Sequence, residues 1–304
     1  MSIVESVSED QIVRTQAISR WSPWGLHRIS SRKQTPGFDF IYPDTAGEGV
    51  DVYVLDSGIM VEHPEFEGRA FLGPSFVDYE ANEDLTGHGT HVAGIVASKS
   101  FGVAKKARII SVKVAGMKPV GRTIDLIMGV QWIVNRVQAQ NDNSLKSVIN
   151  LSMVAELPNI AIERAMTAAI KAKIVVVASA GNTYGNDSCF LSPGRLADVI
   201  TVGASDKLDN IAELSATGSC INIFAPGVSI VSTSNIGFSD TLHGTSMAAP
   251  HVAGVVALAL AENSFREIRD VKEFLISVGT KGALHGDLKG SPNILLYESP
   301  SIFN

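Results

Sequence analysis

GTSMAAPH, residues 244–251, directly precedes the apolar run 252–261. This pattern predicts a turn that delivers Ser246 onto the start of a buried helix. A hydroxyl at that position lies among backbone N–H groups without intrahelical partners, which favour developing negative charge. We expect Pro250 near the first turn, where a missing N–H costs least. Taken alone, the stretch fits an ordinary serine N-cap on a core helix, so other residues must decide whether Ser246 is catalytic.

The composition is that of an ordinary globular protein of 304 residues, with 45% hydrophobic and 18% charged residues. Such a chain can bury one large core or two modest ones. The net charge of −6 gives no reason to expect nucleic acid or an anionic membrane as a partner. We find no apolar run of the ~18 residues that a membrane span requires.

Two further features bear on the compartment. Residues 1–20 lack the apolar core of a signal peptide, which favours a cytoplasmic protein. The chain has two cysteines, Cys189 and Cys220, and they lie in no zinc-binding pattern. They form either one disulfide or two thiols.

Apolar strands alternate with amphipathic helices along the chain, which predicts an α/β fold with a mostly parallel central sheet and helices on both faces. Residues 1–20 resemble a short strand without an obvious partner, and residues 21–36 an irregular arm. No repeat or linker divides the remainder, so we expect one domain over 21–304. The expected strands are 50–55, 108–114, 147–151, 174–177, 199–202 and 221–224, and the expected helices are 92–97, 123–137, 158–172 and two that follow Ser246 and Arg266.

Residues suited to nucleophilic catalysis follow the predicted strands or begin the predicted helices. A serine hydroxyl is a poor nucleophile and needs a base, for which histidine has a suitable pKa of ~6.5. The base needs a carboxylate that fixes its tautomer and stabilises the imidazolium. Asp56, His88 and Ser246 supply one of each, and functional residues collect at the carboxyl ends of parallel strands. Asn182 has an amide N–H suited to an oxyanion, although Asp56 and Asn182 also fit simple turn residues.

Other polar residues have different explanations. His88 and His91 are spaced for a metal pair, but no third ligand lies at a recognisable spacing. His251 lies about 140° around the helix from Ser246, so it should point away from the hydroxyl. We expect structural or surface roles for His27, His63, His243 and His285, and solvated side chains for Asp78, Glu83 and Asp84.

Three stretches together resemble the signature motifs of the subtilisin superfamily of serine endopeptidases: VLDSGI at 54–59, HGTHVAG at 88–94 and GTSMAAP at 244–250. The resemblance is greatest to the group of proteinase K and fungal vacuolar proteinase B. It implies a three-layer subtilisin-like fold. It extends over 21–297 and includes PWGL at 23–26, ISS at 29–31, HPEFEGRA at 63–70, FGVAKK at 101–106 and TVGASD at 201–206.

The resemblance implies a role for each candidate residue. Asp56 orients His88, His88 is general base and then general acid, and Ser246 attacks the scissile carbonyl. Asn182 and the Ser246 N–H hold the oxyanion. We expect a monomer that acts on protein or peptide substrates. Two alternatives stay open: a catalytically silent homologue that binds or inhibits a partner, and a metal-dependent hydrolase. The implied substrate-binding residues are Ser152, Met153, Val154, Ala180 and Gly181.

The segments around the cysteines resemble the disulfide-bearing segments of aqualysin and proteinase B. They imply a Cys189–Cys220 bridge and maturation in an oxidising compartment. We therefore favour a secreted or vacuolar enzyme over a cytoplasmic one. Family members are made with an inhibitory prodomain, and residues 1–20 resemble only the remnant of one. If processing occurs, we expect it near Gln16-Ala17.

Two departures from the family pattern affect binding. The substrate-binding strand of the family usually ends Ser-Leu-Gly-Gly, whereas residues 152–155 read SMVA. Side chains in place of hydrogens should narrow the pocket for the residue before the cut, unless the strand shifts to absorb them. Proteinase K-like calcium sites use an aspartate where this chain has Asn222, and a neutral amide weakens a hard-cation site. We therefore expect no required metal or other cofactor.

Overall fold

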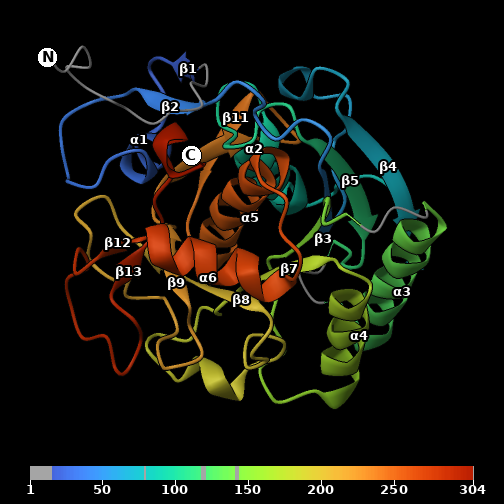
Figure 1. Cartoon of the computed structure of the whole chain (residues 1–304). Helices are drawn as coiled ribbons and strands as arrows, with labels where there is room; N and C mark the ends of the chain where they lie inside the picture. The colour runs from blue at the N-terminus through green and yellow to red at the C-terminus, as the bar shows by residue number, and fades with distance from the viewer. Residues whose placement is uncertain (1–15, 79, 118–120, 141–143, 304) are drawn as a thin grey trace, which may run out of the picture.

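The computed structural model describes residues 16–78, 80–117, 121–140 and 144–303. Nine strands form its central sheet: Asp51–Asp56 (β3), Ala70–Ser75 (β4), Arg108–Lys113 (β5), Ser147–Leu151 (β6), Val175–Ser179 (β7), Ile200–Ser205 (β8), Ile223–Pro226 (β9), Thr280–Lys281 (β12) and Ile294–Leu295 (β13). The strand order is β12-β13-β9-β8-β7-β6-β3-β5-β4 (Figure 1). Neighbouring strands pair in parallel apart from β12 and β13, which pair antiparallel at one edge.

Both faces of the sheet are covered by helices, as the alternating pattern predicts. Successive side chains of a strand point to opposite faces, so Val52 and Val54 of β3 join one core and Tyr53 and Leu55 the other. The first core contains His88–Ala97 (α2), Thr245–Glu262 (α5) and Ile268–Val278 (α6). The second contains Thr123–Ala139 (α3) and Ile160–Lys171 (α4), which lie side by side in Figure 1. The expected three-layer α/β fold is confirmed.

The amino-terminal arm is more regular than expected. Trp24–Ile29 forms a short helix, α1, which buries Leu26 and Ile29. The strand Gln16–Ser19 (β1) pairs antiparallel with Phe40–Pro43 (β2). A second two-stranded sheet joins Ile230–Thr233 (β10) to Ser239–Leu242 (β11). Residues 1–15, which carry most of the expected prodomain remnant, lie outside the described residues.

The core helix α5 corrects two expectations. By length and a mean hydropathy of 1.3 it meets the criteria for a membrane span, although we expected no such run. Because 83% of it is buried inside the protein, it is the core helix of the fold. Pro250 lies inside this helix rather than in its first turn. A proline there cannot donate to the carbonyl of Ser246, four residues earlier, so that carbonyl needs another donor.

Glu298 is a buried carboxyl in the segment that follows β13. Its backbone N–H donates to the Ile29 carbonyl at 2.7 Å. Neither side-chain oxygen has a hydrogen-bond partner in the described part of the chain. Burial therefore raises the pKa of this carboxyl well above its usual range. An uncharged side chain of similar length should suit the site better at neutral pH.

We expect Glu298→Met to raise the free energy of unfolding at pH 8 by about 1–3 kcal/mol, the usual cost of an unsatisfied buried polar group. The gain should shrink at pH 5. When folding raises the pKa of a carboxyl, the cost of its charge is absent below the unfolded pKa, and the protein loses stability as pH rises from there through the folded pKa. Urea unfolding at both pH values measures the change. Glu273→Met, at an exposed position of α6, is the control. Equal gains at the two pH values would contradict this account.

Candidate active site

Three adjacent strands bring the candidate side chains to one end of the sheet. β6 lies between β3 and β7, and Asp56 is the last residue of β3. Ser152 follows β6 directly, and Asn182 lies in the loop after β7. A cleft of about 560 Å³ opens there. Its lining residues are Asp56, Ser57, Thr86, His88, Ala115, Gly121, Ser152, Met153, Val154, Ala155, Glu156, Asn182 and Ser246.

Asp56 and His88 form a hydrogen-bonded pair in this cleft. The His88 Nδ1 lies 2.7 Å from the Asp56 Oδ1, which also accepts from the Ser57 N–H at 2.8 Å. Asp56 is almost fully buried, whereas a third of the His88 side chain is exposed. Because a carboxylate only accepts, Nδ1 carries the proton and Nε2 is left as the basic nitrogen.

The charges around His88 shift its pKa upward. Burial is the largest single effect and lowers the pKa, but the charge of Asp56, its hydrogen bond and the charge of Asp84 together raise it above 6.5. Burial lowers the pKa of His91 and of His251 to about 4, so both are neutral at pH 7. Of these three histidines, His88 is therefore the one whose pKa is raised and not lowered.

The other histidines of α2 and α5 are bonded to the backbone. The His91 Nε2 lies 3.0 Å from the Ile230 carbonyl, which argues against a metal pair with His88. The His251 Nδ1 lies 2.8 Å from the Met247 carbonyl and is buried, so the ring is turned away from Ser246 as predicted. The structural role expected for His63 is also confirmed, since its ring is buried and its Nδ1 accepts from the Glu65 N–H at 3.2 Å.

Ser246 is joined to Ser152 by two reciprocal hydrogen bonds. The Ser246 hydroxyl donates to the Ser152 carbonyl at 2.9 Å. In return the Ser152 hydroxyl donates to the Ser246 carbonyl at 2.8 Å, replacing the donor that Pro250 lacks. Pro250 therefore leaves the Ser246 carbonyl free, and this carbonyl links the start of α5 to the end of β6.

Asn182 is held by the residue before Ser246. Its Oδ1 accepts from both the N–H and the hydroxyl of Thr245 at 2.9 Å. That arrangement leaves its Nδ2 as a donor in the cleft. Gly244, the N-cap of α5, has a φ of +145°, and a Cβ there would lie 3.1 Å from this Nδ2. Glycine suits this position, because it adopts a positive φ without strain and places no Cβ against the Asn182 amide.

The remaining predicted binding residues divide into two groups. Ser152, Met153 and Val154 line the cleft, whereas Ala180 and Gly181 do not. Gly181 lies behind Val154, because a Cβ on it would be 3.5 Å from the Val154 Cγ2 and 2.6 Å from the Leu191 Cδ1. The loop after β6 is also pinned at Ala155, whose N–H donates to the Ser192 carbonyl at 2.9 Å.

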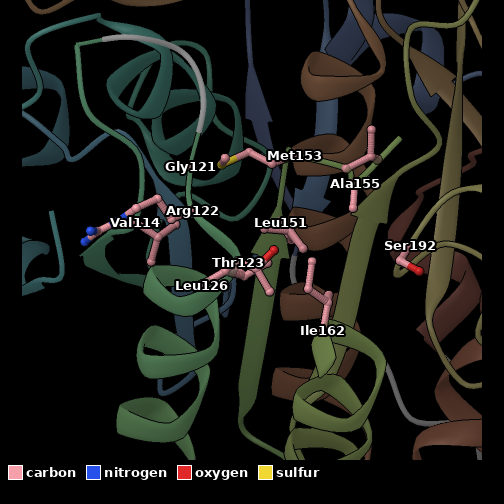
Figure 2. A pocket seen from close by; sticks show the side chains of 11 residues that line it. Val114, Gly121, Arg122, Thr123, Leu126, Leu151, Met153, Ala155, Ile162 and Ser192 are labelled. Carbon is pink, nitrogen blue, oxygen red and sulfur yellow. The ribbon is translucent and has the colours of Figure 1, made fainter. Parts of the chain in front are cut away.

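A smaller hollow of about 70 Å³ adjoins the cleft between the ends of β6, α3 and α4 (Figure 2). Met153, Val154, Ala155 and Gly121 line both spaces. Figure 2 shows the Met153 side chain extending to Gly121, and a Cβ on that glycine would lie 2.9 Å from the Met153 Cε. The methionine therefore forms part of the wall between the two spaces.

Asp84 was wrongly expected to be solvated. It is only 6% exposed, and its carboxylate accepts hydrogen bonds from the turn that precedes His88. Asp78 and Glu83 are exposed as expected, and Asp78 pairs with Arg122. One signal was available: Asp84 stands three residues before Gly87 at a helix start, and aspartate is favoured where backbone N–H groups need an acceptor.

The predicted disulfide is confirmed. Cys189 and Cys220 are bridged, with their Cα atoms 5.2 Å apart. Cys189 belongs to the short 3₁₀ helix Ser188–Phe190 (η2), which precedes the Leu191 and Ser192 contacts. The bridge therefore fixes a segment that supports the loop after β6.

A family model described as the subtilase family, Peptidase_S8, matches residues 47–289. The chain belongs to the subtilase family. This subtilase is 38% identical to the subtilase-type proteinase psp3 of Schizosaccharomyces pombe, over 96% of its own length and 66% of that protein. It is 36% identical to subtilisin-like protease 3 of Saccharomyces cerevisiae, over 97% of its own length and 67% of that protein.

A solved structure agrees with the family assignment. The crystal structure of a cold adapted subtilisin-like serine proteinase matches with a TM-score of 0.84 and 37% identity. The match covers 91% of this chain and 98% of that one. The predicted family and fold are therefore confirmed. The subtilase spans about two thirds of the length of the curated relatives above.

Proposed function

We propose that this subtilase is a serine endopeptidase that cleaves proteins or peptides through an acyl-enzyme on Ser246. The observation that carries the proposal is the 2.7 Å bond between Asp56 and His88 in a cleft that Ser246 and Asn182 also line. A carboxylate, an imidazole with a free Nε2, a hydroxyl at a helix start and an amide donor are the groups that acyl transfer requires.

The proposed reaction begins when the Ser246 hydroxyl turns from the Ser152 carbonyl to the His88 Nε2. Nε2 takes the hydroxyl proton as Oγ attacks the scissile carbonyl, and Asp56 stabilises the imidazolium. The Asn182 Nδ2 and the Ser246 N–H donate to the oxyanion. His88 then gives its proton to the leaving amine as the peptide bond breaks. A water attacks the acyl-enzyme by the same route, which releases the acid and restores the hydroxyl.

The test is the intact mass of the purified protein after treatment with a fluorophosphonate. One adduct that maps to Ser246 supports the proposal, because such reagents need a nucleophile activated by a base. A folded protein without an adduct would overturn it and favour the catalytically silent alternative. Insensitivity of the adduct to chelators would distinguish this reaction from metal-dependent hydrolysis.

We expect the rate of acylation to fall as pH drops through a value above 6.5, because His88 must be neutral to accept the hydroxyl proton and its pKa is raised. A single acid limb is expected, since His91 and His251 are neutral until about pH 4. Fluorophosphonate labelling rates from pH 5 to 9 measure it. Full activity at pH 5 would show that His88 is not the base.

The proposed pocket for the residue before the cut is narrow, because Val154 places a branched side chain beside Gly181. Small or modest apolar residues should be preferred there. We expect Val154→Gly to raise kcat/KM for large aromatic residues at that position by about tenfold to a hundredfold, the value of one or two extra methylenes of pocket space. A peptide library cleaved by both forms measures the change. A wild-type profile that already favours large aromatics would contradict the proposed pocket.

The remaining features of the enzyme are part of the same proposal. The disulfide supports a secreted or vacuolar enzyme, since such bridges persist in oxidising compartments. We propose a monomer that matures by loss of an inhibitory segment near Gln16-Ala17. No required cofactor is proposed, and the Asn222 Oδ1 is already used as an acceptor of the Thr201 N–H at 2.8 Å.

A further inference from the structure

The first turn of α2 obtains its hydrogen-bond acceptors from outside the helix. Its N-cap, Gly87, has no side chain to cap the N–H groups that lack intrahelical partners. Asp84 replaces that cap from the preceding loop. Its Oδ1 accepts from the Gly87 N–H at 2.9 Å, and its Oδ2 accepts from the Thr90 N–H at 2.8 Å and the Thr90 hydroxyl at 2.6 Å. One carboxylate thus spans the turn on which His88 stands.

Two hydroxyls complete the turn. The Ser57 Oγ accepts from the Gly89 N–H at 3.0 Å, and the Thr86 Oγ1 accepts from the His88 N–H at 3.2 Å. The Ser57 hydroxyl in turn donates to the Asp84 Oδ1 at 2.8 Å. Because Ser57 directly follows Asp56, this network joins the end of β3 to the start of α2. Those are the two places whose separation sets the Asp56–His88 bond.

Asp84 carries its charge without a cationic partner among the described residues. A buried carboxylate of that kind is costly unless hydrogen bonds compensate, and here the helix N-terminus supplies them. The Lys113 ammonium of β5 donates to the carbonyls of Ser57 at 3.0 Å and Glu83 at 2.7 Å and pairs with Glu80. Lys113 therefore fixes the backbone beside Asp84, and the Asp84 carboxylate accepts its hydrogen bonds from the start of α2.

We propose that Asp84 is a positioning residue which, with Ser57, fixes His88 relative to Asp56 and places a second negative charge near the base. The inference rests on the proposed role of His88 as general base. The charged and titratable groups around His88 are Asp56 from β3, Asp84 from the loop before α2, His91 from α2 itself and Lys113 from β5. The charge of Asp84 raises the pKa of His88, so it makes the neutral imidazole a stronger base.

The experiment compares four forms of the full chain: wild type, Asp84→Asn, Ser57→Ala and Asp78→Asn. Asp84→Asn removes the charge and leaves one set of N–H donors without an acceptor. Ser57→Ala breaks the link to β3 but keeps the charge. Asp78→Asn is the matched control, because its carboxylate is exposed in the same loop and pairs with Arg122. Fluorophosphonate labelling rates across pH and an NMR titration of the His88 imidazole are measured for each form.

We expect Asp84→Asn to lower the plateau labelling rate about tenfold or more, since misplacing a reacting group by about 1 Å costs up to 10²-fold. Its acid limb and its His88 titration should both move to lower pH, which loss of a purely structural cap would not cause. Ser57→Ala should lower the plateau and move the His88 titration less than Asp84→Asn does, because it loosens the Asp56–His88 bond but keeps the Asp84 charge. Asp78→Asn should match wild type in both measurements.

Two results would overturn the inference: a folded Asp84→Asn that titrates and labels like Asp78→Asn, or an unchanged plateau in Ser57→Ala. If Asp84→Asn does not fold, Ser57→Ala decides alone, because it keeps the buried charge. If wild type forms no adduct, the proposed function fails, and the His88 titration still tests the effect of Asp84. The two failures are therefore distinguishable.

Discussion

Ser246→Ala is expected to abolish the fluorophosphonate adduct and to lower peptide-bond hydrolysis by about 10⁴–10⁶-fold, with the fold unchanged. Two other hydroxyls near Ser246 cannot replace it. The Ser152 hydroxyl is committed to the Ser246 carbonyl at 2.8 Å, and the Ser57 hydroxyl is committed to Asp84 at 2.8 Å. The substitution removes one hydrogen bond, from Oγ to the Ser152 carbonyl, so the folding cost should be only about 1 kcal/mol. Intact mass, turnover of a peptide pool and thermal unfolding measure the three effects.

Ser152→Ala is the matched control for this prediction. It deletes the hydroxyl that holds the Ser246 carbonyl but keeps the backbone carbonyl that accepts from the Ser246 Oγ. The adduct should therefore persist, with turnover reduced by about tenfold through looser positioning of the start of α5. An adduct on Ser246→Ala would show that another residue is the nucleophile. Equal losses of turnover in the two variants would mean that the hydrogen bond from the Ser152 hydroxyl to the Ser246 carbonyl, and not the Ser246 hydroxyl, limits the reaction.

Much of the fold could be predicted because the central strands are buried on both faces. Ser147–Leu151, for example, is buried at every position and carries Val, Ile and Leu, a composition typical of a central strand of a parallel sheet. The short helix Trp24–Ile29 could not be found in this way, since six residues have little helical stability of their own and depend on burying Leu26 and Ile29. The pairing of Gln16–Ser19 with Phe40–Pro43 could not be predicted for a related reason, because it is a long-range contact with no local signal.

The candidate site was predictable where residue type and position at an element end coincide. Asp56 ends a strand and His88 begins a helix, so residue type and position together predicted that both belong to the site. Asp84 was harder to recognise, because its backbone N–H partners leave no trace in composition and its spacing from Gly87 was the available signal. The bond from the Ser152 hydroxyl to the Ser246 carbonyl follows from the position of Pro250 inside α5, so predicting it required the exact start of that helix.

Asn182→Ala is expected to lower kcat by about 10²–10³-fold while KM stays nearly constant. The Asn182 Oδ1 is held by two donors from Thr245, so the Nδ2 is presented in one orientation before substrate arrives. A donor aimed at the oxyanion gains strength only as negative charge develops, so its loss falls on the transition state rather than on binding. Kinetics on a peptide cleaved by wild type measure both constants.

Thr245→Val separates the amide's donor role from its anchoring. It removes the hydroxyl that donates to the Asn182 Oδ1 and keeps the Thr245 N–H that also donates there. Since the Nδ2 remains and one of its two anchors persists, the loss in kcat should be only about tenfold. Thr245 is buried, and valine has nearly the same shape, so the packing at the start of α5 is preserved. If Asn182→Ala raised KM and left kcat unchanged, the amide would be a substrate-binding group, and the oxyanion would depend on the Ser246 N–H at the start of α5.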